Sequence, residues 1–452
     1  MAIKSHRASC SLKFLIVGGS ISGLATAYAL SESGHEVIIV EKSDGRTKVS
    51  GSVRSPPNMT RILKEWPGMA ALFQRRATKC SGHWFGIACS RLLPAETSER
   101  VGFMKFHEQI MSELGADFFV LQHDDLRREL TSLCSAAGVA FEYGRTVVGV
   151  KSDDGVVSIA LNDGKSLIGD IVIGADGRDS IVREIVDDHL EPTHTVAGIN
   201  ISIPTKVVEA TEHLESMCEY NELTIWMGNG LSLTGALDSS AKTFDLSVCS
   251  PMRLEFVDGD WYADHALETT LPLELLRGCD PRLQKLIQKG YTCCPTVQVV
   301  FEQDDIVGLD GTAALVGDAA HSVLIHGSHN ASMAIEDAIT LGRLFSRLSD
   351  RKQIPLLLDA YREIRHPRTR ATQESEYQSL VNISEPSGPL RDVRDGGLKA
   401  TLSKEFEDFH NCEASALLVQ SWEQYLVLFS HDANEEVDNW WSMWGSVVEA
   451  LG

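Results

Sequence analysis

Several features are scarce in this sequence of 452 residues. No stretch reaches the roughly 18 consecutive apolar residues that a membrane-spanning helix needs. The apolar run near the N-terminus, "FLIV" at 14–17, is followed at once by glycines, which indicates a buried strand rather than a signal peptide. We therefore expect no transmembrane segment and a cytoplasmic location.

The sequence shows no residue pattern typical of a metal site or of a binding site for polyanions. The ten cysteines are scattered without paired spacing, and the pair at 293–294 is their only cluster, which is typical of free thiols. No Cys/His group has zinc-type spacing, so we expect no metal site. Positive charge is scarce too: the formal net charge is −22, which argues against nucleic acid and anionic membrane surfaces as partners.

The N-terminal segment carries the first positive signal. Residues 13–42 predict a strand, a glycine turn, a helix and a second strand, which together form a βαβ unit. The turn "GGSISG" matches the dinucleotide-binding template G-x-G-x-x-G, except that Ser20 stands at the second glycine position. Gly18 permits the tight turn and Gly23 lets the helix pack closely on the strand. The helix N-terminus can then bind a pyrophosphate.

A carboxylate follows at the expected interval. Glu41 ends the second strand, about 20 residues beyond the turn, where it can accept a hydrogen bond from a ribose hydroxyl. A carboxylate here disfavours a 2′-phosphate, so these residues favour FAD or NAD over NADP. The glycine motif alone could be a chance turn, but its position between two strands, together with Glu41, indicates a dinucleotide site.

Two later segments extend the pattern. "IVIGADGRDSIVR" (171–183) predicts a buried strand, a turn and a helix start. "LVGDAAH" (315–321), followed by "AIEDA" (334–338), predicts another strand, turn and helix. With these motifs the chain resembles the flavoprotein monooxygenases of the aromatic-hydroxylase type, in their salicylate-hydroxylase-like branch. The resemblance implies FAD as the cofactor, with Asp176 near the dinucleotide and Asp318 holding the ribitol.

The resemblance covers nearly the whole chain. Segments 55–66, 357–376 and 426–441 are similar to further parts of the family, and the similarity is thinnest between 195 and 300. Such proteins carry one FAD-binding domain, a substrate domain over a β-sheet and a helical tail. They have no separate nicotinamide domain, consistent with the single Rossmann unit in this sequence. NAD(P)H is expected as a transient reductant if the enzyme is redox-active.

We therefore predict an α/β fold with a Rossmann-type FAD-binding domain, a mixed β-sheet substrate domain and a helical C-terminal segment. The FAD-binding domain is expected at 11–75, 116–190 and 296–380, the substrate domain at 76–115 and 191–295, and the C-terminal segment at 381–452.

The sequence departs from the family inside the third motif, "GDAAHSVLIHGSHNASMAIEDA" (317–338). The family has two prolines in this loop and a glycine near the helix start, where this chain has Ser322, Ile325 and Asn330. Proline fixes the backbone and glycine permits close approach, so their loss implies a differently shaped pocket beside the reactive edge of the flavin. The candidate catalytic residues of this loop are His326, His329 and Asn330.

A second departure affects cofactor binding. The family generally has an arginine where His123 aligns. Histidine offers less charge and a shorter reach, which predicts weaker flavin binding unless Arg127 or Arg128 compensates. The full set of candidate cofactor-binding residues is Gly18, Ser20, Gly23, Glu41, His123, Asp176 and Asp318.

The substrate region lacks the basic and aromatic residues that the family often has there. Leu231, Ser232 and Ala236 stand in their places, which predicts an apolar and fairly roomy pocket. The expected partner is a hydrophobic organic small molecule. We expect it to be fairly large and apolar, like a polyketide or a terpenoid. The predicted function is an FAD-dependent monooxygenase that inserts one oxygen atom of O2 into this substrate with NAD(P)H.

The rewritten loop leaves an alternative open. A flavin-fold enzyme could instead act as a non-redox cyclase or isomerase, pericyclase-like, on a natural-product intermediate. His326 and His329 would then serve as acid–base groups, because histidine titrates near neutrality. Both histidines could equally face solvent. A non-catalytic flavoprotein binder is a third class, which no residue favours. The residues do not determine the oligomeric state or the choice between NADH and NADPH.

Overall fold

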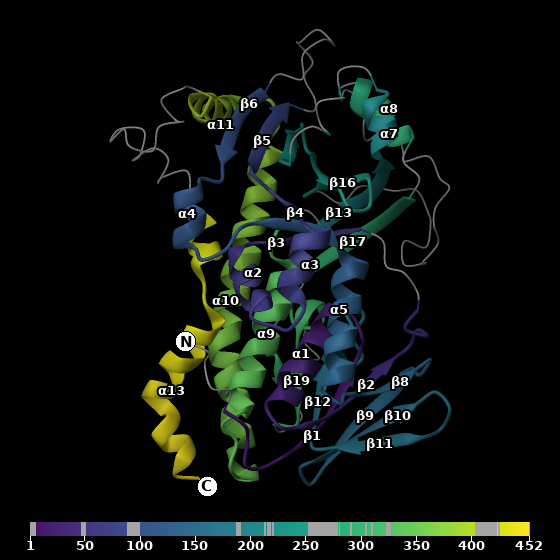
Figure 1. Cartoon of the computed structure of the whole chain (residues 1–452), viewed down its shortest axis with the longest axis vertical. Coiled ribbons are helices and arrows are strands. Elements are labelled where there is room, and N and C mark those ends of the chain that lie inside the picture. The colour runs from purple at the N-terminus through teal and green to yellow at the C-terminus, as the bar shows by residue number, and fades with distance from the viewer. Residues whose placement is uncertain are drawn as a thin grey trace.

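The computed structural model describes residues 6–46, 51–87, 100–186, 191–211, 214, 218, 221–251, 279, 281–289, 292–302, 305–308, 311–321, 327–402, 423 and 425–451. Two large sheets lie toward the two ends of an elongated molecule (Figure 1). The long helix α10 (Ile354–Ile383) runs between them.

The lower sheet in Figure 1 has six strands in the order β18-β19-β12-β1-β2-β8. These are β18 (Val307–Gly308), β19 (Ala313–Leu315), β12 (Ile171–Gly174), β1 (Lys13–Val17), β2 (Glu36–Glu41) and β8 (Ala140–Tyr143). All neighbours are parallel except β18 and β19. The apolar run of β1 is buried from Phe14 onward, as a strand covered on both faces must be.

Helices and a small sheet cover this parallel sheet. Helix α1 (Ile21–Glu32) packs against α9 (Asn330–Phe345) and α5 (His123–Ala136). An antiparallel meander lies beside β1 and β12; its strands are β9 (Val147–Asp153), β10 (Val156–Leu161) and β11 (Ser166–Gly169). The Rossmann-type unit is therefore complete.

The upper sheet has seven strands in the order β17-β13-β16-β15-β14-β5-β6. These are β17 (Thr292–Glu302), β13 (Glu191–Pro204), β16 (Thr243–Ser250), β15 (Ser232–Asp238), β14 (Leu223–Met227), β5 (Gly82–Ile87) and β6 (Arg100–Lys105). All neighbours are antiparallel except β14 and β5. The sheet is therefore mixed.

Alternate residues of the upper sheet belong to two apolar clusters, one on each face. The outer cluster contains Trp226 and Leu231 together with residues of α7 (Thr205–Glu209) and α8 (Pro281–Gln288). The inner cluster contains Leu223 together with Leu380 and Phe429 from the C-terminal part of the chain. The inner face is thus the one that meets the rest of the molecule.

A three-stranded sheet, β3-β7-β4, lies between the two large sheets (Figure 1). Its strands are β3 (Ser52–Ser55), β7 (Phe119–Gln122) and β4 (Thr78–Lys79). The remaining helices are α2 (Pro57–Lys64), α3 (Met69–Arg76), α4 (Glu108–Glu113), α6 (Arg183–Val186), the 3-10 turns η2 (Gly317–Ala319) and η3 (Arg351–Gln353), α11 (Pro389–Ala400) and α13 (Ala433–Glu449).

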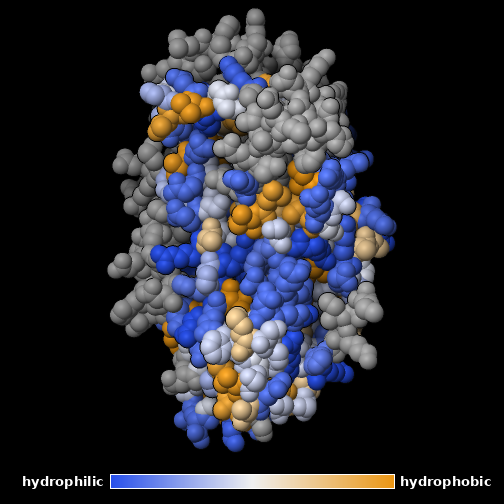
Figure 2. All heavy atoms as spheres, turned by 90° about the vertical axis from the view of Figure 1, so that its left-hand side faces the viewer, coloured by the Kyte–Doolittle hydropathy of each residue, from blue (hydrophilic) through white to orange (hydrophobic). Residues whose placement is uncertain are grey.

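Helix α13 packs against α9 and α10 near the C-terminus. The face on this side of the molecule is mostly hydrophilic, with hydrophobic patches between the polar side chains (Figure 2). In the described part of the chain, every helix is too short or too polar to span a bilayer.

The predicted fold class is confirmed. The strand–helix–strand unit predicted at 13–42 is observed as β1, α1 and β2. The division into domains stays a prediction. Strand β17 and helix α10 each cross one of its boundaries.

Candidate cofactor-binding and active site

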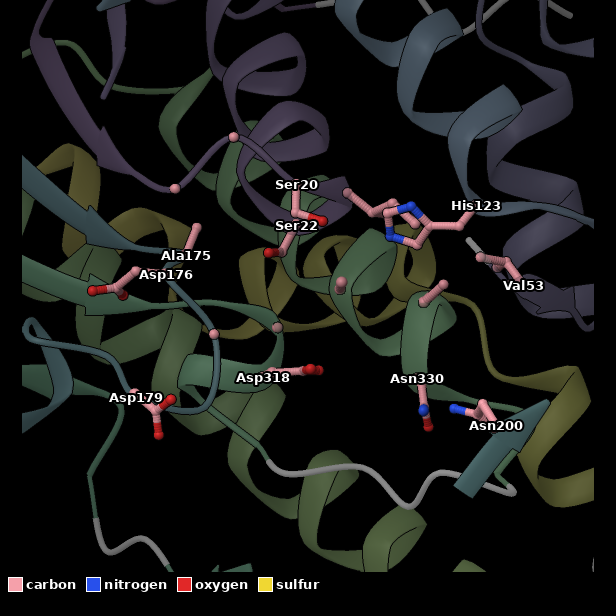
Figure 3. A pocket seen from close by; sticks show the side chains of 18 of the residues that line it. Ser20, Ser22, Val53, His123, Ala175, Asp176, Asp179, Asn200, Asp318 and Asn330 are labelled. Atoms are coloured by element: carbon pink, nitrogen blue, oxygen red, sulfur yellow. The ribbon is translucent and has the colours of Figure 1, made fainter. Parts of the chain in front are cut away.

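A cavity of about 750 Å³ opens between the two large sheets (Figure 3). Residues at the carboxyl ends of β1, β2 and β12 form one side, and residues of β13 and β16 form the other. Open α/β sheets bind their ligands at this carboxyl edge. The segments with cofactor motifs and the inner face of the upper sheet therefore border the same space.

The glycine turn brings α1 close to the strands. The backbone of Gly18 has a φ of +104°, and a Cβ there would lie 2.3 Å from the Ala175 carbonyl oxygen. A Cβ on Gly23 would lie 2.0 Å from the Gly18 carbonyl oxygen. Gly18 borders the cavity, whereas Gly23 lies behind the wall and acts through packing.

Ser20 is the N-cap residue of α1 and borders the cavity. Its backbone is extended, and its side chain makes no capping hydrogen bond. Figure 3 shows Ser20 and Ser22 at the start of the helix, beside the cavity. The N-terminal turn of a helix carries unsatisfied N–H groups and a partial positive charge, so this end of the cavity fits a pyrophosphate.

Glu41 is oriented by the backbone on both sides. Its Oε2 accepts a hydrogen bond from Gly19 N at 2.6 Å, and its Oε1 accepts one from Ser43 N at 2.8 Å. The carboxylate borders the cavity. Each carboxylate oxygen can accept a second hydrogen bond, so Glu41 can still bind a ribose hydroxyl.

Asp176 orders the turn that follows β12. Its side chain borders the cavity and accepts hydrogen bonds from Ser180 Oγ and from Ile181 N, the latter at 2.9 Å. Burial raises the pKa of this carboxyl, and the hydrogen bonds lower it in part. The carboxylate thereby shapes the cavity wall beside the glycine turn.

Asp318 projects into the cavity from η2 (Figure 3). Its side chain is exposed toward the cavity but enclosed by protein, and this enclosure raises the pKa of the carboxyl. The charges of His321, Arg178 and Arg183 lower it in part. A carboxylate held here can accept hydrogen bonds from the hydroxyl groups of a ribitol chain.

A buried charge network holds the turn that carries Asp318. Asp337 Oδ2 accepts hydrogen bonds from Gly317 N at 2.9 Å and pairs with His321 Nε2 at 2.7 Å. Arg365 of α10 donates to Asp337 Oδ1 and to Glu336 Oε2, both at 2.7 Å. Burial alone would raise the pKa of the Asp337 carboxyl, but His321 and Arg365 lower it below its usual range. The "AIEDA" segment therefore acts by anchoring this turn.

His123 borders the cavity as the first residue of α5. Burial, followed by the charge of Arg127, lowers the pKa of its imidazole to about 4. Arg127 donates to Asp124 and to the Gly45 carbonyl oxygen, and Arg128 pairs with Asp124 at the surface. Within the described chain neither arginine borders the cavity. Neither therefore supplies the charge that a histidine at 123 lacks.

Asn330 and Asn200 meet across the cavity. Asn330 is the first residue of α9, Asn200 belongs to β13, and their side chains point toward one another (Figure 3). Asn200 Oδ1 accepts a hydrogen bond from Ser247 Oγ at 2.6 Å. Among the described residues, nothing donates a hydrogen bond to the buried Oδ1 of Asn330. The oxygen is buried at the start of α9.

Four polar residues on the inner face of the upper sheet border the cavity, and we call them the polar strip: Asn200, Ser202, Asp245 and Ser247. They form two cross-strand pairs of β13 and β16, Asn200 with Ser247 and Ser202 with Asp245. Ser202 Oγ donates to Asp245. Burial raises the pKa of the Asp245 carboxyl, and the nearby charge of Asp238 raises it further.

The three residues that predicted an apolar pocket lie differently. Leu231 packs in the outer cluster, away from the cavity. Ser232 is fully buried, and only Ala236 borders the cavity. Side chains alternate along a strand, so Ser232 and Ala236, four residues apart on β15, share one face, whereas Leu231 precedes the strand and packs on the other.

The candidate catalytic residues are split by the structure. Asn330 borders the cavity, but His329 is buried behind its wall and only 2% exposed. Nδ1 of His329 lies 2.8 Å from Oε1 of Glu376 on α10. His326 lies outside the described residues. The catalytic roles of all three residues stay predictions.

Four residues at or behind the cavity wall were missed from sequence: Arg54, Asn200, Asp245 and Glu376. A weak signal existed for Asn200 and Asp245, because each is a polar residue at alternate positions of an apolar strand. No local signal marks Arg54 or Glu376.

A family model described as an FAD binding domain matches residues 11–251, more than half of the chain. The chain belongs to this family. The FAD-dependent monooxygenase OpS4 of Beauveria bassiana (strain ARSEF 2860) is 23% identical over 440 residues, covering 95% of this chain and 97% of that protein. A second, structural likeness is to CtdE in complex with FAD and substrate 4, with a TM-score of 0.73 at 16% identity, covering 97% of this chain and 100% of that one. A salicylate hydroxylase substrate complex has a TM-score of 0.65 at 19% identity, covering 90% of this chain and 97% of that one.

These findings confirm the predicted resemblance. The chain is a flavoprotein in the family of FAD-dependent monooxygenases, and FAD is its cofactor. The structure fits this cofactor: the close approach at Gly18 and Gly23, the oriented Glu41 and the enclosed Asp318 all surround one cavity. The individual contacts of the candidate cofactor-binding residues stay predictions.

Proposed function

We propose that the protein is an FAD-dependent monooxygenase that inserts one atom of O2 into an organic substrate and releases the other as water, with electrons from NAD(P)H. One continuous cavity with two unlike walls carries this proposal. The glycine turn, Glu41 and Asp318 form the first wall, and the polar strip belongs to the second. A flavin held by the first wall would have its ring beside a molecule resting against the second.

Bound FAD would supply the hydride acceptance and the O2 activation. In this proposal the chain itself binds, orients and excludes water. Glu41 holds a ribose hydroxyl, Asp318 holds the ribitol, and the N-terminal turn of α1 faces the pyrophosphate. The two sheets enclose the reacting atoms, which protects reactive species from water.

The polar strip supports a substrate that carries hydrogen-bond donors, such as hydroxyl or amine groups. Carboxylate and amide oxygens accept hydrogen bonds, and a buried acceptor without a donor costs free energy. Asp245 and Asn330 offer such acceptors at the cavity. The polyketide- or terpenoid-like molecule expected from the sequence fits this wall when its apolar body bears hydroxyl or amine groups.

A non-redox cyclase is the second candidate, because the part of the cavity wall at His123 carries no positive charge. His123 stands where the family generally has arginine, and its lowered pKa keeps it neutral at pH 7. Without an arginine at position 123, the wall supports negative charge on a reduced ring less well. His329 lies behind the wall. Under this alternative Asp245 and Asn330 would therefore contact the reacting molecule.

Anaerobic reduction of the FAD-loaded protein tests the proposal. The visible flavin band is followed after addition of NADH or NADPH, with 2-naphthol, with naphthalene or with no ligand. We expect bleaching that air reverses, and a rate at least about tenfold higher with 2-naphthol than with naphthalene, because one hydrogen bond to a charged acceptor contributes about 1.5–3 kcal/mol. Asp245→Leu should remove this difference, whereas Asp438→Asn, at an exposed carboxylate, should keep it.

The outcomes separate the candidates. A flavin that stays oxidised with both nucleotides and every ligand would contradict the monooxygenase and favour the cyclase. Equal rates with 2-naphthol and naphthalene would contradict only the proposal that the substrate carries hydrogen-bond donors. The monooxygenase proposal would stand.

A further inference from the structure

The rewritten loop is held from behind by one carboxylate. Oε1 of Glu376 accepts hydrogen bonds from Ser328 N at 2.7 Å and from His329 N at 3.0 Å, and it pairs with His329 Nδ1 at 2.8 Å. Glu376 is 6% exposed. Ser328 borders the cavity, and His329 is the N-cap residue of α9. Glu376 therefore fixes the loop at the point where it meets both the cavity and the helix.

Gly327 leaves room for this carboxylate. A Cβ on Gly327 would lie 2.0 Å from Glu376 Oε2 and 2.7 Å from Glu376 Cδ. Any larger side chain would displace Glu376 from the loop. Because Gly327 also borders the cavity, only the loop backbone separates the carboxylate from the cavity at this residue.

A positive charge also contacts the same loop. Arg54 of β3 borders the cavity and donates to the Gly327 carbonyl oxygen at 3.4 Å. Burial lowers the pKa of its guanidinium, and electrostatic interactions with Cys249, Glu376 and Cys80 counteract this effect. Arginine keeps its charge in proteins. Arg54 and Glu376 thus place two opposite charges beside one segment of the cavity wall.

Two-electron reduction with uptake of one proton adds a negative charge to a flavin ring. In a partly enclosed site a nearby carboxylate opposes such a charge and a guanidinium favours it. We propose that Glu376 and Arg54 are positioning residues that hold loop 327–330 on the cavity wall and shift the reduction potential of bound FAD in opposite directions. This inference rests on the bound flavin and does not require that the enzyme oxygenates anything.

Midpoint potentials of the FAD-loaded protein test the proposal, with xanthine and xanthine oxidase as the source of electrons and reference dyes as the scale. Glu376→Gln keeps an acceptor for the loop amides but removes the charge, so it should raise the potential. Arg54→Met should lower it. Each shift should correspond to about a tenfold change in the reduction equilibrium, or about 30 mV for a two-electron couple.

The matched control is Glu374→Gln, two residues away on the exposed side of α10. It should leave the potential unchanged, and the double variant Glu376→Gln/Arg54→Met should fall between the two single variants. Shifts of the same sign in the two single variants, or none in either, would overturn the proposal. If one variant fails to retain FAD, the sign of the potential shift in the other variant, measured against the control, still decides. The measured potentials would keep their meaning even if neither the wild type nor any variant oxygenated a substrate.

Discussion

At the scale of single residues, the cofactor end of the cavity depends on a glycine at which a Cβ atom would collide with the neighbouring backbone. Gly23 lies beside the Gly18 carbonyl oxygen with no room for a methyl group, although neither its backbone angle nor its burial is unusual. The constraint comes from the close approach of α1 to the turn. Gly149 on β9 offers a contrast, because no atom lies within 4 Å of the position of its Cβ.

Gly23→Ala should therefore separate α1 from the turn. We expect the FAD dissociation constant to rise at least tenfold and the free energy of unfolding to fall by about 1–3 kcal/mol, the usual cost of overpacking. Fluorescence titration with FAD and urea denaturation measure the two effects. Gly149→Ala should change neither, and an unaltered FAD affinity in Gly23→Ala would contradict the packing role.

At the scale of elements, α9 and α10 are joined by charges rather than by apolar contacts alone. Arg365 is fully buried and bridges Glu336 and Asp337, and Arg368 adds a second contact to Glu336. Asp337 in turn holds the Gly317 amide. The pairing of the two helices therefore decides where Asp318 stands in the cavity.

Arg365→Met should leave two buried carboxylates without the guanidinium that bridges them. Breaking a buried ion pair from one side costs about 3–5 kcal/mol, so we expect a fall of that size in the free energy of unfolding, together with loss of FAD retention. Arg362→Met on the same helix is the control, because its partners Asp305 and Asp359 are partly exposed and surface pairs contribute about 0–1 kcal/mol. Similar losses in the two variants would contradict the network.

At the scale of the whole molecule, three neutral histidines couple stability to pH. Burial lowers the pKa of His83 to about 3 and those of His123 and His431 to about 4. In the unfolded chain each would titrate at its ordinary pKa of 6.5. Between these values the unfolded state binds more protons than the folded state. The free energy of unfolding should therefore fall as the pH decreases from about 6.5 to about 4.

His83→Phe should flatten this dependence. The ring of His83 lies among Phe106, Phe118 and Tyr425, and among the described residues neither ring nitrogen has a hydrogen-bond partner. A phenyl ring suits this environment and cannot be protonated. We expect the slope of stability with pH to fall by up to about 1.4 kcal/mol per pH unit between about pH 4 and pH 6.

Urea denaturation at several pH values measures the slope. His6→Gln, at an exposed histidine, should leave it unchanged. The same slope in the wild type and in His83→Phe would show that His83 is not held neutral in the folded protein.

Prediction from sequence succeeded where one short segment contains both the signal and its consequence. The glycine turn, the helix and Glu41 lie within residues 13–42, and the structure places the turn and Glu41 at one cavity. Prediction was weaker for side chains on the upper sheet. An apolar substrate pocket was predicted there from Leu231 and Ser232, but the residues that border the cavity include Asn200 and Asp245 instead.

The sequence by itself determined the βαβ unit and a dinucleotide site, because glycine spacing, apolar runs and a strand-end carboxylate are local patterns with local physical causes. FAD and the family followed from the resemblance carried by the later motifs. The tertiary structure alone decided what lies opposite the cofactor end and what supports the rewritten loop. The polar strip depends on the register of β13 with β16, which pairs Ser202 with Asp245. The contact between His329 and Glu376 joins residues 47 positions apart. Strand register and helix packing are set by the whole core, so no local pattern specifies these neighbours.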